Sequence, residues 1–410
     1  MSSSAAASSR AHHLRLVRAE DLLGSRARNR VATRRTVALL LGSTAFLVGT
    51  GLIMVLSSSS ISAFAEYGDS FRYFQRQLAY SVVGVLALVL TSRMRYAAWQ
   101  RLATPLLGVT FVLMVVVLLP GAGIEAYGSS RWFQFGPVTI QPSELAKLAL
   151  VVFAAATLTR KWGRLDDVGH LTVPLLPVGI LCCGLVMFQP DLGTTAILAG
   201  SVFLMVFVAG VRLRYLSLAA IVGSAVGMGL VMSADYRRIR FLSFLHPWED
   251  ARNTGYQLAQ SLIALGSGGW TGVGLGASRQ KWQYVPNAHT DFIFSILGEE
   301  LGLLGELVVL VAYGTLIYAG IRIAARTTDV FGRLLAAGIV SWFGVQALIN
   351  LGAVTGLLPI TGVPLPFLSY GGSSLVVSLA AVGILVNIAN APSRRKARAA
   401  PPKRRRARVA

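Results

Sequence analysis

Ten long apolar runs, separated by shorter polar segments, constrain this sequence more than any other feature. They are Thr36–Leu56, Gln77–Leu90, Ala103–Leu119, Leu145–Leu158, Leu171–Phe188, Leu192–Gly210, Tyr215–Met232, Phe292–Tyr318, Leu334–Leu358 and Ser373–Ile388. A helix of roughly 20 mostly apolar residues crosses the hydrocarbon core of a membrane. Only 13% of the 410 residues are charged, whereas a soluble domain has about 25%. The pattern predicts an all-α polytopic membrane protein with about ten transmembrane helices.

The basic residues predict which ends of these helices face the cytoplasm. With the N-terminus inside, 28 of the 38 Lys and Arg residues fall in the tails or in cytoplasmic loops, as the positive-inside rule requires. Ten spans then return the C-terminus to the cytoplasm. We therefore expect a basic cytoplasmic tail at residues 1–35, a membrane domain at residues 36–392 and a second basic cytoplasmic tail at residues 393–410.

The net charge of +21 does not make nucleic acid the expected partner. Eight basic residues precede Thr36 and nine follow Pro392, a placement typical of contact with anionic lipid head groups. The first apolar run is too long for the core of a cleaved signal peptide, about 7–15 residues, so it is expected to remain as an anchor. Cys182 and Cys183 are adjacent within an apolar run, which indicates packing rather than a disulfide or a zinc site.

The longest connection, residues 233–290, is predicted to lie outside the cell between the seventh and eighth helices. Connections longer than about 12–15 residues are usually functional or disordered. This one contains Trp248, Trp270 and Trp282, and aromatic side chains favour the membrane interface. Its glycine-rich stretch at residues 266–276 is no nucleotide fingerprint, because no strand precedes it. We expect an interfacial loop with tight glycine turns.

The segment that joins this loop to the next apolar run is the strongest candidate for chemistry. It reads Pro-Asn-Ala-His-Thr-Asp-Phe-Ile-Phe at residues 286–294, and Thr290 is expected to cap the helix so that Asp291 lies in its first turn. One interpretation is a carboxylate that stabilises the helix N-terminus. The other is a general base that takes a proton from a hydroxyl nucleophile. His289 is the competing base.

Three acidic residues, Glu299, Glu300 and Glu306, follow on the same predicted helix. Glu299 and Glu306 are seven residues apart and are expected to share a face. A rise of about 1.5 Å per residue places Glu299 roughly 12 Å deeper than Asp291. Acidic side chains at membrane depth are costly and are usually functional or paired. We expect them to support the structure or to couple helices, with direct substrate contact as the alternative.

Two further external turns each have a proline at the start of a helix, where its missing N–H costs little. The first, Gln-Pro-Ser-Glu at residues 141–144, places Glu144 on the same helix face as Lys147. The second ends at Asp191. The Lys147 ammonium either pairs inside the protein or faces a polar cavity, and we favour the cavity. Arg131 belongs to the same external region.

External basic residues are candidates for binding the pyrophosphate of a lipid-borne substrate, because Arg offers paired donors to phosphate and Lys offers a point charge. We single out Arg131, Lys147, Arg238 and Lys281. The connection at residues 358–374 is rich in Pro and Gly and includes Ser369. Irregular backbone near membrane depth is tolerated where it lines a wet cavity, so this connection is expected to form a cavity wall.

In combination these motifs resemble the SEDS family (shape, elongation, division and sporulation) over roughly residues 36–390. The motifs, which occur in the family's order, are residues 130–132, 141–147, 189–194, 286–294, 298–302 and 364–374. Within the family, the Met-Val-Leu-Ser-Ser-Ser stretch at residues 54–59 and the basic extensions are more similar to the division branch, FtsW, than to the elongation branch, RodA. At Asn287 many members carry Glu, so no acidic role is expected there.

The resemblance implies a peptidoglycan glycosyltransferase in a bacterial plasma membrane, at the division septum. It would polymerise lipid II beside a class B penicillin-binding protein and other division proteins. The resemblance implies Asp291 as the general base and gives importance to Arg131 and Lys147. The supporting candidates are His289, Glu144, Asp191, Glu299, Glu300 and Ser369. No cofactor is certain, and a divalent cation is possible.

Other functions remain open from the sequence. An elongation-type polymerase of the same family is one. A lipid II flippase or transporter is another, with Glu299 and Glu306 as its pathway. The third is a scaffold that recruits division proteins through its basic tails.

Overall fold

The computed structural model describes residues 2–126, 129–136, 138–164, 168–282 and 284–391. The helices are α1 Ser2–Tyr67, α2 Arg72–Arg93, α3 Tyr96–Val116, α4 Pro142–Arg160, η1 Trp162–Arg164, α5 Val168–Phe188, α6 Leu192–Val208, α7 Leu213–Met232, α8 Asp235–Leu245, α9 Tyr256–Ser267, α10 Ile293–Arg326, α11 Val330–Val354 and α12 Gly372–Asn390. Three short strands, β1 Ile124–Ala126, β2 Ser129–Phe135 and β3 Val138–Ile140, form an antiparallel sheet. The predicted all-α polytopic class is confirmed.

Eight of these helices are long and apolar enough to cross a membrane: α1 over Val31–Tyr67, α2, α3, α4, α7, α10, α11 and α12. Two shorter apolar helices, Val173–Phe188 within α5 and Leu192–Val208, occupy the places of the fifth and sixth predicted spans. Helix α5 is interrupted at Val173, whose φ of −98° and ψ of 123° are extended. The count of ten spans therefore stays a prediction.

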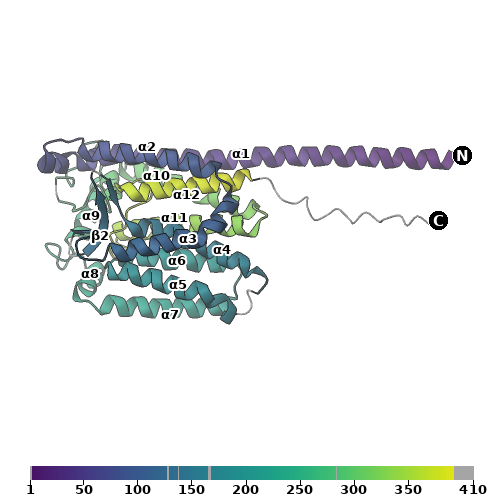
Figure 1. The fold of residues 1–410 in the computed structure, drawn as a ribbon. Helices are drawn as coiled ribbons and strands as arrows, with labels where there is room; N and C mark the ends of the chain where they lie inside the picture. Colours follow the sequence, from purple (N-terminus) through teal and green to yellow (C-terminus); the bar gives the residue numbers. More distant parts are fainter. Residues whose placement is uncertain (1, 127–128, 137, 165–167, 283, 392–410) are drawn as a thin grey trace.

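The helices lie side by side in one bundle, with α4 near its centre and α7 at its edge (Figure 1). Nearly every residue of α4 is buried, whereas α7 buries only Leu216 and Val231. The sheet, α8 and α9 gather at the end of the bundle opposite to the start of α1 and the end of α12 (Figure 1). The candidate site residues before α4, α6 and α10 belong to that same end.

The long connection expected as an interfacial loop contains two helices. Helix α9 buries Leu258, Ala259 and Ala264 and packs on α10. Helix α8 packs on α7 and exposes Ile239 and Leu242. The three-stranded sheet between α3 and α4 was not anticipated. Strands β1 and β3 have three residues each, too few to show an alternation, and the seven residues of β2 were read as part of an external loop.

Helix α10 differs from its prediction at two points. It begins at Ile293, and the Thr290 hydroxyl donates to the Asn287 carbonyl at 3.1 Å instead of capping the helix. Asp291 therefore precedes the helix. The helix is also interrupted at Gly302, where φ is 65° and ψ is −170°. This break interrupts the helical register from which the shared face of Glu299 and Glu306 was predicted.

The glycine-rich segment at residues 266–276 closes the break in α10. Four backbone hydrogen bonds satisfy the groups that the break leaves free: Val273 N to Glu299 O at 3.0 Å, Gly274 N to Glu300 O at 3.0 Å, Leu303 N to Gly269 O at 2.9 Å and Leu304 N to Trp270 O at 3.1 Å. A buried backbone group without a partner would be costly. The expected tight glycine turns are present, and they brace a transmembrane helix.

Candidate functional site

Asp291 lies in the turn that precedes α10, and its side chain is half-buried. Its backbone carbonyl accepts a hydrogen bond from Asn350 Nδ2 at 2.8 Å. The same nitrogen donates to the carbonyl of Val363 at 2.7 Å. Asn350 belongs to α11 and is 2% exposed. One buried amide thus joins the Asp291 turn to the 358–374 connection.

The carboxylate of Asp291 faces that connection at Gly362. A Cβ atom at Gly362, whose φ is +73°, would lie 3.4 Å from Asp291 Oδ2. Next to it, Thr361 Oγ1 is buried, and within the described residues it has no hydrogen-bond partner. The same holds for Asn350 Oδ1. Unsatisfied buried polar atoms are uncommon in proteins, and these two belong to the chain neighbour of Gly362 and to the residue that holds the Asp291 backbone.

The other side of this connection contacts the N-terminus of α6. A Cβ atom at Gly193 would lie 2.3 Å from Val363 Cγ2 and 3.0 Å from the Thr361 carbonyl oxygen. Asp191 caps this helix, with its carboxylate accepting from the backbone N–H and the hydroxyl of Thr194, both at 2.8 Å. The backbone of the 358–374 connection, the predicted cavity wall, therefore lies between Asp291 on one side and the N-terminus of α6 on the other.

Arg131 reaches the same helix end from β2. Its Nη2 donates to the Pro190 carbonyl at 2.9 Å, and its Nε is buried with no hydrogen-bond acceptor among the described residues. The guanidinium can therefore bind an anion through its remaining N–H group, while the Asp191 carboxylate already caps the N-terminus of α6. Arg131 and the Asp191 cap are therefore neighbours at the start of α6.

Lys147 is paired inside the protein. Its Nζ lies 2.7 Å from Glu144 Oε2 and donates to Gln346 Oε1 at 3.0 Å, and it stands 5.4 Å from the centre of the Trp342 ring. Lys147 is 1% exposed. The favoured interpretation, an ammonium that faces a polar cavity, is wrong for this state, because a buried charge needs a partner, and here Glu144 on the same helix and Gln346 on α11 are its partners.

His289 packs in an aromatic cluster beside Asp291. Its ring centre lies 4.8 Å from that of Tyr73 and 5.5 Å from that of Tyr370, and its carbonyl accepts from Tyr370 N at 2.9 Å. Burial lowers the pKa of His289 to about 4. The imidazole is therefore neutral near pH 7. These contacts support a structural role and leave Asp291 as the better candidate base.

The lowered pKa of His289 predicts that the stability of the protein depends on pH. Between pH 6.5 and about 4 the unfolded chain binds a proton at His289 that the folded chain does not, so the free energy of unfolding decreases as the pH falls. We expect His289→Gln to lack this contribution. Thermal unfolding in detergent should show its Tm rising relative to wild type as the pH is lowered from 7 to 4. A constant difference across that range would contradict the assignment.

The remaining predicted residues have other surroundings. Arg238 is exposed on α8 and pairs with Asp235 at 3.4 Å. Lys281 is buried, and its Nζ contacts the Gly276 carbonyl at 2.5 Å and Glu300 at 3.7 Å. Their described contacts do not join them to Asp291. Their assignment as pyrophosphate ligands stays a prediction.

Ser369 holds the 358–374 connection in place. Its hydroxyl accepts from Leu365 N at 2.8 Å, and its carbonyl accepts from Gln77 Nε2 at 3.2 Å. Gln77 Oε1 accepts in turn from Gly371 N at 3.3 Å. Ser369 thus stabilises the conformation of the 358–374 connection and its attachment to α2.

Two site residues escaped the sequence analysis, Gln346 and Asn350. They are four residues apart on α11 and both are buried, and Gln346 Nε2 donates to the Pro364 carbonyl at 2.8 Å. Two amides on one face of an otherwise apolar run are a usable signal, because polar groups at membrane depth are usually functional or paired.

Replacing Asn350 by Leu removes the amide that holds the Asp291 turn. Two carbonyl groups then lose their donor, which costs about 1–3 kcal/mol each where burial is complete, and the turn is free to move. A misplacement near 1 Å can cost about 100-fold in rate. We expect kcat to fall by about that factor with a Tm decrease, measured against Asn253→Ala in the external connection as control. Unchanged kcat would contradict this role.

Among the described residues, no group of three or more His, Cys, Asp or Glu side chains is placed to hold a metal ion. A divalent cation bound mainly by a substrate's phosphates would need only one or two protein carboxylates.

Known proteins resemble this chain along most of its length. The sequence profile of the FtsW/RodA/SpoVE family, described as cell cycle proteins, matches residues 38–394. Stage V sporulation protein E of Bacillus subtilis is 43% identical over 350 residues, which cover 85% of this chain and 96% of that protein. The probable peptidoglycan glycosyltransferase FtsW of Geobacter metallireducens is 43% identical over 338 residues, which cover 82% and 90%.

Solved structures share the fold. A chain from a study of how a peptidoglycan synthase complex coordinates polymerization and crosslinking aligns with a TM-score of 0.72 at 30% identity, covering 85% of this chain and 96% of that one. The rod shape determining protein RodA of Thermus thermophilus aligns with a TM-score of 0.64 at 28% identity, covering 85% and 95%. The resemblance recognised in the motifs is confirmed, with similarity to FtsW: this membrane protein belongs to the FtsW/RodA/SpoVE family, the SEDS proteins.

Proposed function

We propose that the protein is a peptidoglycan glycosyltransferase that polymerises lipid II into glycan strands for septal wall synthesis. The observation that carries the proposal is the half-buried Asp291 at the loop-bearing end of the bundle, with its backbone carbonyl held by Asn350 and its carboxylate beside Gly362. Relatives with 43% and 42% identity over most of the chain are probable peptidoglycan glycosyltransferases.

In the proposed reaction Asp291 takes the proton of the acceptor's GlcNAc 4-hydroxyl. The hydroxyl oxygen forms a bond to the anomeric carbon of the donor's MurNAc, and the bond from that carbon to the pyrophosphate oxygen breaks. The products are a glycan longer by one disaccharide and undecaprenyl pyrophosphate. A carboxylate at the outer end of a membrane helix can serve a sugar whose lipid anchor stays in the bilayer.

The leaving pyrophosphate needs positive charge where its own negative charge develops. Arg131 beside the N-terminus of α6 is the best placed of the predicted cations, because its Nε has no acceptor among the described residues. Lys147 is neutralised by Glu144 in this state. Its contribution would require that ion pair to open.

We propose a class B penicillin-binding protein and other division proteins as partners. The similarity to a chain of a peptidoglycan synthase complex supports this. The similarity to FtsW proteins supports placement at the septum. An elongation-type role remains the alternative within the family, since RodA shares the fold.

A flippase is less well supported. Its predicted pathway needs Glu299 and Glu306 on one face, and the break at Gly302 interrupts that face. The Glu299 carboxylate is also occupied by three donors from residues 278–280.

Purified full-length protein in proteoliposomes, with a partner transpeptidase, is expected to convert labelled lipid II into glycan strands resolved on gels. Deletion of residues 1–30 and 394–410 should leave this activity, because the site lies in the membrane domain. Translocation of lipid II without strand formation would overturn the proposal in favour of a flippase. Failure of both activities would favour the scaffold.

A further inference from the structure

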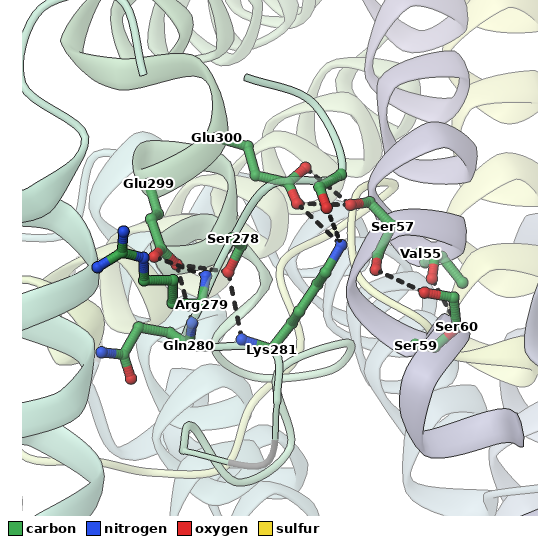
Figure 2. A network of polar contacts seen from close by, with 11 residues as sticks. Val55, Ser57, Ser59, Ser60, Ser278, Arg279, Gln280, Lys281, Glu299 and Glu300 are labelled. Atoms are coloured by element: carbon green, nitrogen blue, oxygen red, sulfur yellow. Dashed lines mark hydrogen bonds and ion pairs between the residues drawn. The ribbon is translucent and has the colours of Figure 1, made fainter. Parts of the chain in front are cut away.

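Two consecutive carboxylates, Glu299 and Glu300, are buried just before the break in α10. Glu299 is 2% exposed and Glu300 is fully buried. They lie between the 276–281 segment and the outer part of α1 (Figure 2). Buried carboxylates are costly unless donors and cations surround them, so their partners show what they hold together.

Glu299 is bound by the external connection. Its carboxylate accepts from the Ser278 hydroxyl, from Arg279 N at 2.9 Å and from Gln280 N at 3.3 Å (Figure 2). The Ser278 oxygen also accepts from Lys281 N at 3.2 Å. Three consecutive residues therefore fold around one carboxylate.

Glu300 binds two further elements. The Ser57 hydroxyl from α1 lies 2.6 Å from Oε1 and 2.8 Å from Oε2, so it can donate to either oxygen. Lys281 Nζ lies 3.7 Å from Oε1 and donates to the Gly276 carbonyl at 2.5 Å. Lys281 is 6% exposed. The Lys281 ammonium is therefore buried and pairs with the Glu300 carboxylate inside the protein.

The chain between these contacts is the segment that carries Asp291. This segment begins after Lys281, which contacts Glu300, and ends before Glu299. The two carboxylates therefore join both ends of the segment. Fixing both ends restricts the conformations that the residues between them can adopt. We propose that Glu299, Glu300, Lys281 and Ser57 form a clamp that positions the Asp291 carboxylate, with Lys281 as its internal counter-ion.

This inference rests on the proposed role of Asp291, and it assigns Lys281 a task other than binding pyrophosphate. A pyrophosphate ligand contributes to binding or to charge stabilisation at the reacting atoms. A positioning residue instead acts on the geometry of the base. The two roles predict different changes in KM, in kcat and in the mobility of residues 284–291.

The test uses Lys281→Met, which keeps length but removes the charge, in the full-length protein with its partner transpeptidase. We expect kcat to fall about 100-fold, because small misplacements of a base have effects of this size, while KM for lipid II changes less than about twofold. Hydrogen exchange of residues 284–291 should become at least about tenfold faster. Lys281→Arg should keep kcat and the exchange rate of residues 284–291 close to wild type. Arg252→Met, which removes an exposed charge in the same connection, should change neither kcat nor this exchange rate.

Ser57→Ala and Glu300→Gln provide milder variants if Lys281→Met does not fold. Both should accelerate exchange in residues 284–291, and the double variant of Ser57→Ala with Lys281→Arg should show non-additive effects. A raised KM with unchanged kcat and unchanged exchange would overturn the clamp and assign Lys281 to the substrate. Faster exchange without loss of kcat would confirm the clamp but contradict Asp291 as the base. Unchanged exchange in every variant would overturn the clamp.

Discussion

Asp291→Asn is expected to lower the rate of lipid II polymerisation by about 10²–10⁴-fold, the usual contribution of a general base. The amide keeps the shape of the side chain and the backbone contact to Asn350, but it cannot accept the proton of the attacking hydroxyl. Expression and Tm should be close to wild type, because the carboxylate is half-buried and precedes α10.

The matched control is Asp235→Asn, an exposed acid on α8 that pairs with Arg238 at 3.4 Å. It should keep wild-type activity. Asp291→Glu should retain more activity than Asp291→Asn, because it keeps the base and shifts it by one methylene. Polymerisation by Asp291→Asn within about threefold of wild type would reject Asp291 as the base.

The second large effect is expected at Gly272, where the glycine-rich segment meets the break in α10. Its φ is +77°, and a Cβ atom would lie 2.1 Å from the Glu300 carbonyl oxygen. The backbone would have to move, which breaks the hydrogen bonds of Val273 and Gly274 to Glu299 and Glu300. Gly272→Ala should destabilise the protein by about 4 kcal/mol or more, the range of severe core defects.

Two other glycines of the same segment, Gly276 and Gly266, distinguish steric overlap from left-handed backbone strain as causes of this loss of stability. At Gly276 φ is +79° but no atom lies within 4 Å of an added Cβ, so Gly276→Ala should cost only the left-handed backbone strain, about 1–2 kcal/mol. At Gly266, inside α9 and equally open, alanine should stabilise by about 0.5–1 kcal/mol. Thermal unfolding in detergent should rank the three variants in this order. An equal Tm for Gly272→Ala and Gly266→Ala would contradict the bracing of the break.

The sequence was informative where one physical signal dominates. Apolar runs predicted the helices, because a membrane-spanning segment must satisfy its own backbone and expose apolar side chains. The proline of residues 141–144 marked the start of α4 at Pro142, as expected. The apolar run at residues 292–318 gave no sign of the break at Gly302, because glycine does not interrupt an apolar run.

Contacts between residues far apart in the chain explain most of the errors at the site. Asp291 was predicted from its local motif, but Asn350, which holds its carbonyl, is 59 residues away. Lys147 was expected to face a cavity although Glu144 lies on the same helix face, and its second partner, Gln346, is 199 residues distant. The pairing of Glu300 with Ser57 spans 243 residues. Periodicity and capping describe neighbours in sequence, and these contacts arise only when helices pack.

The central claim is that the side chain at position 291 meets the substrate at the outer surface of the membrane. Asp291→Cys, in a background with Cys182→Ser and Cys183→Ala, allows a direct measurement with a membrane-impermeant thiol reagent on intact spheroplasts. We expect modification from outside, and slower modification when lipid II is added. Modification only after the cytoplasmic face is opened, or none on either side, would contradict the account.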